Sequence, residues 1–239
     1  MPARPRSSVK SRTLAVGDVH GCRVALETVL AAAAPVAGDV VVTLGDYIDR
    51  GPDTRGVLDY LTTWRRRHPG VRLVALRGNH EIMLLNGRVS REAAEMWLGV
   101  GGEQALASYA TDASPGSPAD IPPAHWQFLE RRLLPYHETD THLFVHAGVY
   151  AELTLSDQPD DVLYWEHLRH APPRHRSGKT TVCGHTPQRS GLPRVYEHAV
   201  CLDTAACDGQ WLTCLCCGTG ELWQASEAGE TRSLWLDEV

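Results

Sequence analysis

The amino-acid sequence predicts an α/β fold whose polar loops gather at one edge of a sheet. Short apolar runs that read as strands alternate with helical segments through the first third of the chain, and a loop rich in Asp, His or Asn follows each of five such runs. In open α/β sheets, binding sites form at the carboxyl ends of the strands. The five runs are residues 13–16, 40–44, 71–76, 142–145 and 180–183.

The loops after these runs carry side chains that bind divalent metals. The first two intervals, 28 residues from Asp18 to Asp46 and 33 from Asp46 to Asn79, suit βαβ units of roughly 30 residues. Right-handed crossovers then bring successive loops to the same sheet edge. In chain order the loops are Gly17-Asp18-Val19-His20-Gly21, Gly45-Asp46-Tyr47-Ile48-Asp49-Arg50-Gly51, Gly78-Asn79-His80-Glu81, His146-Ala147-Gly148 and Gly184-His185-Thr186.

Helices are predicted between the first loops and in a middle insertion. We expect a disordered tail at residues 1–11 and one domain at 12–239, with a helical insertion at about 82–140 that covers the site and carries no ligand-like cluster. Helices are expected at 22–34, 53–67, 91–98, 103–109 and 123–133, with Gly99–Gly102 interrupting the middle pair. Further strands are expected at 198–202, 210–216 and 220–225.

Composition excludes several classes of protein. A net charge of −6 argues against a broad nucleic-acid surface, and no apolar run reaches the 18 residues that a membrane span needs. Seven cysteines, an odd number, without a secretory signal favour reduced thiols and a cytoplasmic location. The Cys214–Cys217 cluster lacks zinc-ligand spacing and is predicted to be part of a core strand.

The loop residues suit a centre of two divalent ions that hydrolyses phosphate esters. Such a centre holds the phosphate and shares an attacking hydroxide between ions about 3.5–4 Å apart. Asp46 lies in the central one of the first three loops and is the expected bridging carboxylate. Asp18 and His20 would complete the first ion. The second ion would be completed by Asn79, His146 and His185.

Five motifs occur in a set order between about residues 13 and 217: GDxHG, GDxxDRG, GNHE, HAG and GHT. In this order they resemble the metal-dependent phosphoprotein phosphatases of the calcineurin-like metallophosphoesterase superfamily, in its compact bacterial branch. The resemblance implies a calcineurin-like metallophosphoesterase fold, a β-sandwich flanked by helices, and the same six metal ligands. It also implies that His80 is the general acid and Asp49 its partner. Arg50 would grip the phosphoryl oxygens, with Asn79 also contacting substrate.

One part of the family pattern is not reproduced. The family places a second phosphate-binding arginine between the last two metal histidines, often shortly after a tryptophan. Here Trp165 is followed by Glu166-His167-Leu168-Arg169, so Arg169 is the first candidate for substrate binding and Arg174 the second. Glu81 is expected to interact with backbone amides at a helix start, and Cys22 to be inert.

These observations predict a phosphoserine and phosphothreonine hydrolase, with phosphotyrosine and small phosphomonoesters as additional substrates. Its partner would be a phosphoprotein or small phosphoester, with no nucleic acid or membrane. The cofactor would be two divalent ions, with Mn²⁺ the first candidate and Fe or Zn²⁺ the alternatives. A diadenosine tetraphosphate hydrolase and a non-catalytic metal-binding scaffold are the competing hypotheses. The sequence does not specify the oligomeric state.

Overall fold

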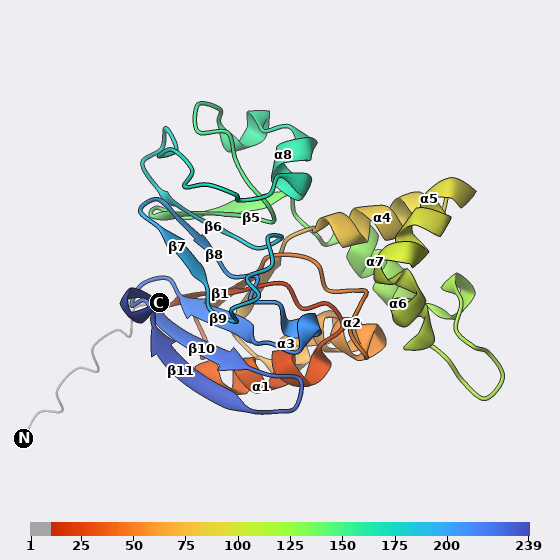
Figure 1. Ribbon diagram of the computed structural model, residues 1–239. Coiled ribbons are helices and arrows are strands. Elements are labelled where there is room, and N and C mark those ends of the chain that lie inside the picture. Colours follow the sequence, from red (N-terminus) through yellow and green to blue (C-terminus); the bar gives the residue numbers. More distant parts are fainter. Residues whose placement is uncertain (1–10) are drawn as a thin grey trace, which may run out of the picture.

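The computed structural model describes residues 11–239 and folds them into two β-sheets that pack face to face (Figure 1). The expected tail at 1–11 lies, except for its last residue, outside the described residues. The first sheet has the order β11-β10-β9-β1-β2-β3, and the second has the order β4-β5-β6-β8-β7. The first comprises β1 (Thr13–Val16), β2 (Val40–Thr43), β3 (Arg72–Ala75), β9 (Leu212–Cys216), β10 (Glu221–Ala225) and β11 (Thr231–Trp235). The second comprises β4 (Tyr136–Glu138), β5 (His142–Val145), β6 (Thr180–Cys183), β7 (Arg194–Tyr196) and β8 (Ala199–Cys201).

Parallel strands in both sheets bring their carboxyl ends to the same edge. In the first sheet β1, β2 and β3 are parallel and in step, with Thr13 opposite Val40 and Val40 opposite Arg72. In the second sheet β5 and β6 are parallel, with His142 opposite Thr180. Because strands in step end at the same height, the loops that follow them emerge side by side. This pairing positions the polar loops of the sequence.

The sheets bury an apolar layer between them, which makes the fold a β-sandwich. The layer draws residues from both sheets, and burying such side chains stabilises a fold by roughly 1.5–3 kcal/mol each. The alternation of side chains along each strand leaves every second residue for the outer faces. The buried residues of this layer are Ala15, Val42, Leu44, Val74, Leu76, Phe144, Val182, Val200, Leu202, Leu215 and Leu222.

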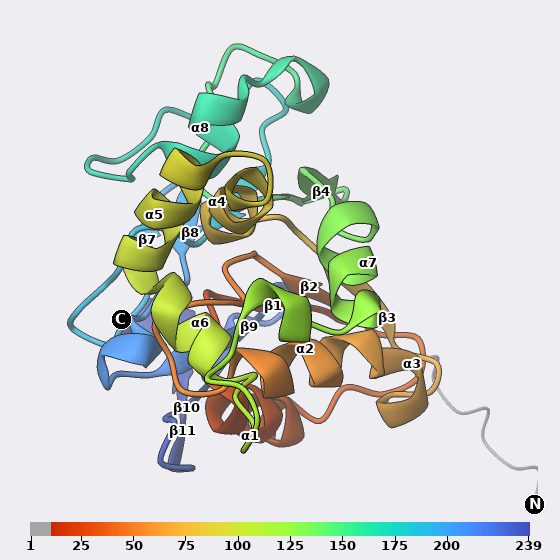
Figure 2. The same ribbon diagram turned by 90° about the vertical axis from the view of Figure 1, so that its right-hand side faces the viewer.

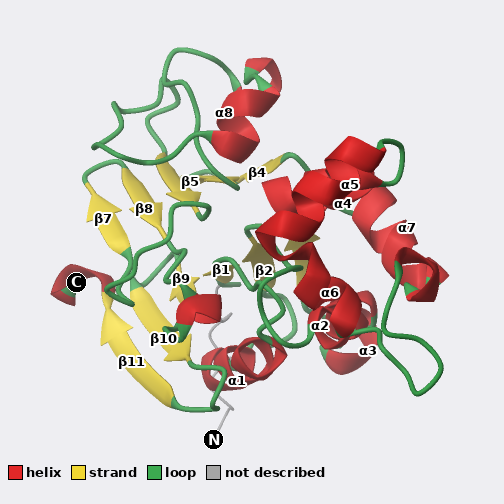
Figure 3. Ribbon diagram, turned by 45° about the vertical axis from the view of Figure 1, so that its right-hand side comes forward, coloured by secondary structure: helices red, strands yellow, loops and turns green. Residues whose placement is uncertain are grey.

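Helices cover the outer faces of the sandwich (Figure 3). Beside the first sheet lie α1 (Arg23–Ala33), α2 (Thr54–Thr62) and α3 (Trp64–Arg67), and beside the second lies α8 (Asp160–Trp165). One face of α1 is apolar, with residues at helical spacing, and is buried against the sheet. The residues of this face are Leu26, Val29, Leu30 and Ala33. The side chain of Asp53 caps α2 by accepting from the backbone N–H of Gly56 at 2.7 Å.

The middle of the chain forms a helical group at one side of the sandwich (Figure 2). It contains α4 (Asn79–Gly87), α5 (Arg91–Trp97), α6 (Glu103–Ala107) and α7 (Pro123–Arg131). The expected break at Gly99–Gly102 is a wide helical turn, Leu98–Gly102, in which Gly101 has φ 124°. A β-carbon there would lie 2.7 Å from the backbone nitrogen of Arg50, so the turn needs glycine at this position.

The structure differs from the sequence-based expectation in several elements. The helix expected at 53–67 is divided at Thr63 into α2 and α3. The start of α4 at Glu81 was expected but its extent was not, and helix α8 and strands β4, β7 and β11 were not predicted. Strands β4 and β7 have three residues each, too few to show a periodicity, and β11 is only half-buried at an edge of its sheet. Within residues 11–239, no helix is long and apolar enough to cross a membrane.

An ion pair between the buried Asp39 and the half-buried Arg12 anchors the start of the sandwich. The Asp39 carboxylate precedes β2 and accepts from the Arg12 backbone N–H at 2.8 Å, from Arg12 Nε at 3.0 Å and from the Val36 N–H at 3.0 Å. Burial by itself raises the pKa of Asp39, but the hydrogen bonds from Arg12 and Val36 outweigh it, and the net pKa is below its usual value. The interaction connects the entry of β1 to the turn after α1.

We predict that Asp39→Asn lowers the free energy of unfolding by about 2 kcal/mol at pH 7, because it removes a buried, hydrogen-bonded charge. A carboxylate whose pKa is lowered by folding stabilises the fold above its unfolded pKa of about 3.9, and this contribution is lost as the pH falls through the folded value. Thermal unfolding from pH 7 to pH 3 should therefore show the two proteins converging in acid. A difference that stays constant with pH would contradict this role.

Candidate active site

The loops that carry the candidate residues are held in backbone conformations that L-amino acids rarely adopt. Outside glycine, only seven described residues have positive φ, and five of them lie in these loops. Each such residue costs about 1–3 kcal/mol and persists only where the surrounding structure imposes it. The five are His20 (φ 43°), Asp46 (φ 50°), Asp49 (φ 74°), Arg50 (φ 64°) and His185 (φ 62°).

Asp46 is the central carboxylate of the site. Its Oδ2 lies 3.4 Å from His20 Nε2 and 4.0 Å from His80 Nε2, and its Oδ1 lies 3.5 Å from His146 Nε2. Two groups of potential metal-binding atoms therefore share this side chain, one with His20 and His80 and the other with His146 and His185. The two-sided geometry is what a bridging carboxylate requires.

Backbone carbonyls fix the tautomers of the histidines around Asp46. His20 Nδ1 lies 2.8 Å from the carbonyl oxygen of Ile48, and His146 Nδ1 lies 2.8 Å from that of Leu44. A nitrogen that faces a carbonyl carries the proton and donates it, so the Nε2 atoms turned toward Asp46 are unprotonated. This arrangement of an outer acceptor behind an imidazole is common in metal sites.

His20 and His185 stay neutral at physiological pH. Burial lowers the pKa of His20 to about 3, although the Asp46 charge opposes it. Burial, together with the neighbouring His146, lowers the pKa of His185 to about 3. Neutral imidazole is the form that binds metals.

Asn79 lies between Asp46 and the second pair of histidines. One terminal atom of its amide lies 2.9 Å from His146 Nε2, 3.1 Å from His185 Nδ1 and 3.2 Å from Asp46 Oδ2. Turned with its NH2 inward, the amide donates to all three of these acceptors. Turned with its oxygen inward, it adds a further acceptor to a buried group of lone pairs that a cation would neutralise. The residues present therefore fit a bound divalent ion.

Asp18 has a buried oxygen that a cation would also neutralise. Its Oδ2 accepts from the backbone N–H of His185 at 2.9 Å, whereas the buried Oδ1 has no partner among the described residues. Burial, followed by the nearby charges of Asp203 and Asp46, raises the pKa of Asp18 well above its usual value. Gly184 leaves room for this carboxylate, because a β-carbon there would lie 1.9 Å from Oδ1.

His80 begins a hydrogen-bonded relay that extends into the helical group. His80 Nδ1 lies 2.6 Å from Asp49 Oδ2, and the indole Nε1 of Trp97 donates to both oxygens of Asp49 at 2.9–3.0 Å. Burial lowers the pKa of His80, but the Asp46 charge and the Asp49 hydrogen bond outweigh it and raise the pKa above its usual value. No local sequence pattern around Trp97 indicates this role, and only its contact with Asp49 shows it.

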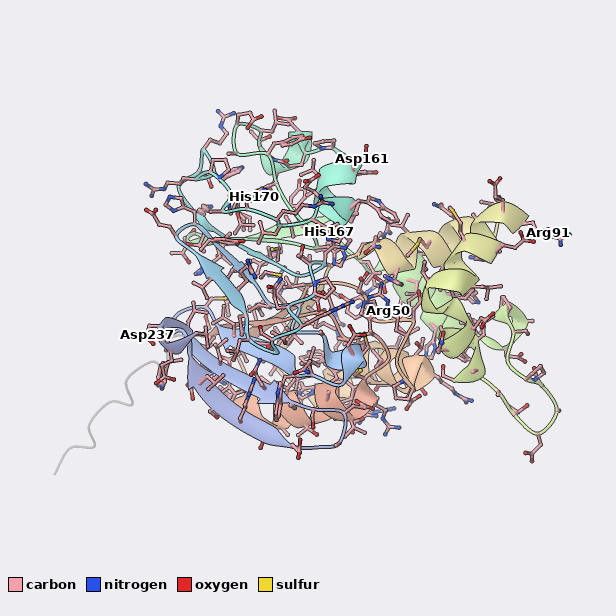
Figure 4. All side chains as sticks on the ribbon, viewed as in Figure 1. Arg50, Arg91, Asp161, His167, His170 and Asp237 are labelled. Atoms are coloured by element: carbon pink, nitrogen blue, oxygen red, sulfur yellow. The ribbon has the colours of Figure 1, made fainter. Side chains whose placement is uncertain are left out.

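Arg50 is the exposed cation of the cluster. Its Nη1 lies 3.0 Å from His20 Nε2, and its backbone N–H donates to the carbonyl of Gly101 at 3.2 Å. Figure 4 shows Arg50 between the strand ends and the helical group, with His167 above it at the end of α8. The ring of His167 stacks on that of His185, with centroids 4.7 Å apart.

The two candidates for a second phosphate-binding arginine make no hydrogen bond or ion pair to the cluster among the described residues. No hydrogen bond or ion pair joins the side chain of Arg169 to it in the described part of the chain. Arg174 donates from Nη2 to the carbonyl of Gly178 at 3.2 Å, within its own loop. The assignment of Arg169 to substrate binding stays a prediction.

Glu81 joins two of the ligand loops through backbone amides, as expected. Its buried carboxylate accepts from the N–H groups of Asp46 at 3.0 Å, Tyr47 at 2.8 Å and Gly78 at 2.8 Å. Gly78 also keeps the path clear for Asp46, since a β-carbon there would lie 2.1 Å from Asp46 Oδ1. Glu81 thereby sets the distance between the second and third loops.

Comparison with known protein families decides the relationship. The family model for calcineurin-like phosphoesterases matches residues 11–211, which is most of the chain. The chain belongs to the calcineurin-like phosphoesterase family. Members of this family use two divalent metals, in agreement with the two ligand groups that share Asp46.

Individual relatives of this phosphoesterase have different named activities. It is 30% identical over 209 residues to serine/threonine-protein phosphatase 1 of Salmonella typhimurium, covering 83% of this chain and 88% of the relative. It is 34% identical over 143 residues to the symmetrical bis(5'-nucleosyl)-tetraphosphatase of Paraburkholderia phymatum, covering 60% of this chain but 44% of the relative. A cold-active protein-tyrosine phosphatase from a Shewanella species shares the fold, with TM-score 0.61, 20% identity and coverage of 94% and 80%.

We predict that Glu81→Gln destabilises this phosphoesterase by about 2–3 kcal/mol, because one side-chain oxygen becomes an N–H donor that faces backbone donors in a buried site. Affinity for divalent metal should fall as well, since the two loops lose their shared acceptor. Urea unfolding and isothermal titration with Mn²⁺ measure both effects. Glu92→Gln, at an exposed carboxylate in the first turn of α5, is the matched control and should change neither.

Proposed function

We propose that this phosphoesterase hydrolyses phosphoserine and phosphothreonine in proteins, with phosphotyrosine and small phosphomonoesters as additional substrates. The observation that carries the proposal is the pairing of a two-sided carboxylate, Asp46, with a histidine relay directly beside it. The similarity to the Salmonella phosphatase covers 83% of this chain and 88% of the relative and supports a protein substrate. Site residues come from both sheets, in agreement with one domain over residues 12–239.

The same proposal assigns six residues to two divalent ions. Asp46 is shared, and the orphaned oxygen of Asp18 and the histidine lone pairs that face Asn79 are the positions that cations would neutralise. When bound, two such ions supply positive charge to the phosphoryl group and lower the pKa of water. Mn²⁺ is the first choice for this mixed ligand set, ahead of Fe and Zn²⁺. The six ligands are Asp18, His20, Asp46, Asn79, His146 and His185.

The remaining residues of the site bind the phosphoryl group and move a proton. Arg50 is exposed at the rim, and its guanidinium presents a planar pair of donors that suits two phosphoryl oxygens. Asp49 holds Nδ1 of His80, so the proton that can be donated lies on Nε2, which faces the Asp46 side of the site. Protonating a departing serine or threonine alkoxide at this atom lowers the barrier to P–O cleavage.

The competing activity is dinucleoside tetraphosphate hydrolysis. The identity to the Paraburkholderia enzyme favours this activity. That identity, 34%, is slightly higher than the 30% to the Salmonella phosphatase, but the alignment spans less than half of the Paraburkholderia relative. Mn²⁺-loaded protein assayed on a phosphoserine peptide and on diadenosine tetraphosphate separates the two. We expect the larger kcat/KM on the phosphopeptide. A larger value on the dinucleotide would reverse the order, and no turnover of either would favour a non-catalytic scaffold.

We also propose a cytoplasmic location. All seven cysteines are free, and five of them are buried. Cys214 and Cys216 lie in the buried strand β9, as small core residues do, and burial raises the pKa of the Cys207 thiol to about 11. Burial also raises the pKa of Cys22, so this thiol is unreactive at neutral pH, as expected. Unpaired, protonated thiols suit a reducing compartment.

We predict that His80→Asn lowers kcat on a phosphoserine peptide by on the order of 10²–10³, because the alkoxide leaves without a proton. The loss on p-nitrophenyl phosphate should be much smaller, since nitrophenolate is a good leaving group. Steady-state kinetics on both substrates at saturating Mn²⁺ measures the difference. Equal losses on the two substrates would remove His80 from the acid role.

We predict that Trp97→Phe reproduces the same pattern in weaker form, with about a tenfold loss on the phosphopeptide. The substitution keeps an aromatic ring but removes the indole N–H that holds Asp49. Trp126→Phe, in the same helical group, is the control, because the Trp126 indole N–H makes no hydrogen bond to another described residue. If both variants lose activity equally on both substrates, Trp97 only supports packing.

A further inference from the structure

A groove lined by arginines lies between α3, β3 and α7, away from the ligand loops. Figure 2 shows these three elements together on one side of the molecule. Its volume is about 880 Å³, and none of the candidate site residues lines it. Apolar side chains line it as well, among them the buried Trp64, Val71 and Phe128. We name this feature the arginine groove, after its exposed side chains Arg65, Arg66, Arg72 and Arg132.

The positive charge of the arginine groove is uncompensated. No acidic residue lines it, although the chain as a whole carries a net charge of −6. In the described part of the chain, none of its four arginines forms an ion pair. Exposed arginines elsewhere do form such pairs with neighbouring carboxylates, for example Arg23, Arg55 and Arg91. A concave surface of one sign concentrates ligands of the opposite sign.

The arginine groove also contains an open strand edge. Strand β3 is the last strand of its sheet, and its Arg72 and Leu76 N–H groups donate toward β2, to Asp39 and Thr43. Because peptide groups alternate in direction along a strand, those of Leu73 and Ala75 point away from β2. The Ala75 carbonyl accepts from Leu134, which leaves the peptide groups of Leu73 at the open part of the edge.

We propose that the arginine groove binds an extended acidic segment of a partner protein. The backbone of the segment would pair with β3 at Leu73, and its Asp or Glu carboxylates would meet the four arginines. A nucleic acid is disfavoured on two grounds. The large aromatic rings of the groove, Trp64 and Phe128, are only 3% and 6% exposed, and one partly exposed ring, His68, is already stacked on Trp64. A strand edge, in contrast, recognises peptide backbone. This surface is distinct from the phosphoester site and does not depend on the proposed substrate.

The test measures binding of a fluorescein-labelled decapeptide of alternating Glu and Val by fluorescence anisotropy at 150 mM salt. The variant Arg66→Glu/Arg132→Glu reverses two groove charges. The control variant, Arg91→Glu/Arg189→Glu, makes the same change in net charge at two side chains that lie outside the groove. These side chains are 92% and 86% exposed. Figure 4 shows Arg91 at the outer end of α5. We expect Kd to rise at least tenfold in the groove variant and less than twofold in the control. Turnover of p-nitrophenyl phosphate should be unchanged in both, which reports that both fold.

Amide exchange supplies the backbone part of the test. Saturating peptide should slow hydrogen exchange of the Leu73 amide in the wild-type protein. Any one of four outcomes would overturn the proposal. The two variants could bind the acidic peptide with equally raised Kd, or the wild-type protein could bind a peptide of alternating Lys and Val equally well. The acidic peptide could show no binding below 1 mM, or hydrogen exchange at Leu73 could stay unchanged when it binds. Tighter binding of a single-stranded oligothymidine that the groove variant loses would assign the groove to nucleic acid instead.

Discussion

The convergence of proton-free acceptors on Asp46 is the constraint on which the rest of the structure depends. Carboxylate oxygens and imidazole nitrogens meet in a buried space, and their tautomers are set by carbonyls of Leu44 and Ile48 behind them. Without a cation this arrangement is electrostatically unfavourable, so the fold must hold it in place. Glu81 does so by binding the backbone of two loops at once, and Gly78 does so by leaving the space that Asp46 occupies.

The β-sandwich provides the rigidity that this geometry needs. Strands β1, β2 and β3 run in step, and a buried apolar layer fixes them against the second sheet, so that His146 and His185 arrive opposite Asp46. Residues with positive φ are concentrated in these loops, and the strain that they carry is supported by the packed sheets below. Stability in the sandwich thus permits a strained, preorganised site at its edge.

The sequence indicated which candidate residues gather at one sheet edge better than it indicated the covering elements. Proposed ligands such as Asp18 and His185 follow short, mostly buried strands, and polar residues at strand ends are a local signal that can be read without coordinates. The role of Trp97 could not be predicted, because its contact with Asp49 joins residues 48 positions apart and no local pattern reports such a contact. Strand β11 was missed because an edge strand with one exposed face carries little hydrophobic contrast. The arginine groove depends on the packing of α7 beside β3, which the sequence does not reveal.

The central claim is that Asp46 is shared by two divalent ions, and anomalous scattering tests it most directly. A crystal of the protein loaded with Mn²⁺, measured at the manganese absorption edge, should show two anomalous peaks about 3.5–4 Å apart, one on each side of the Asp46 carboxylate. The His20 side and the His146 side should each hold one peak. A single peak, or two peaks that do not share Asp46, would contradict the account.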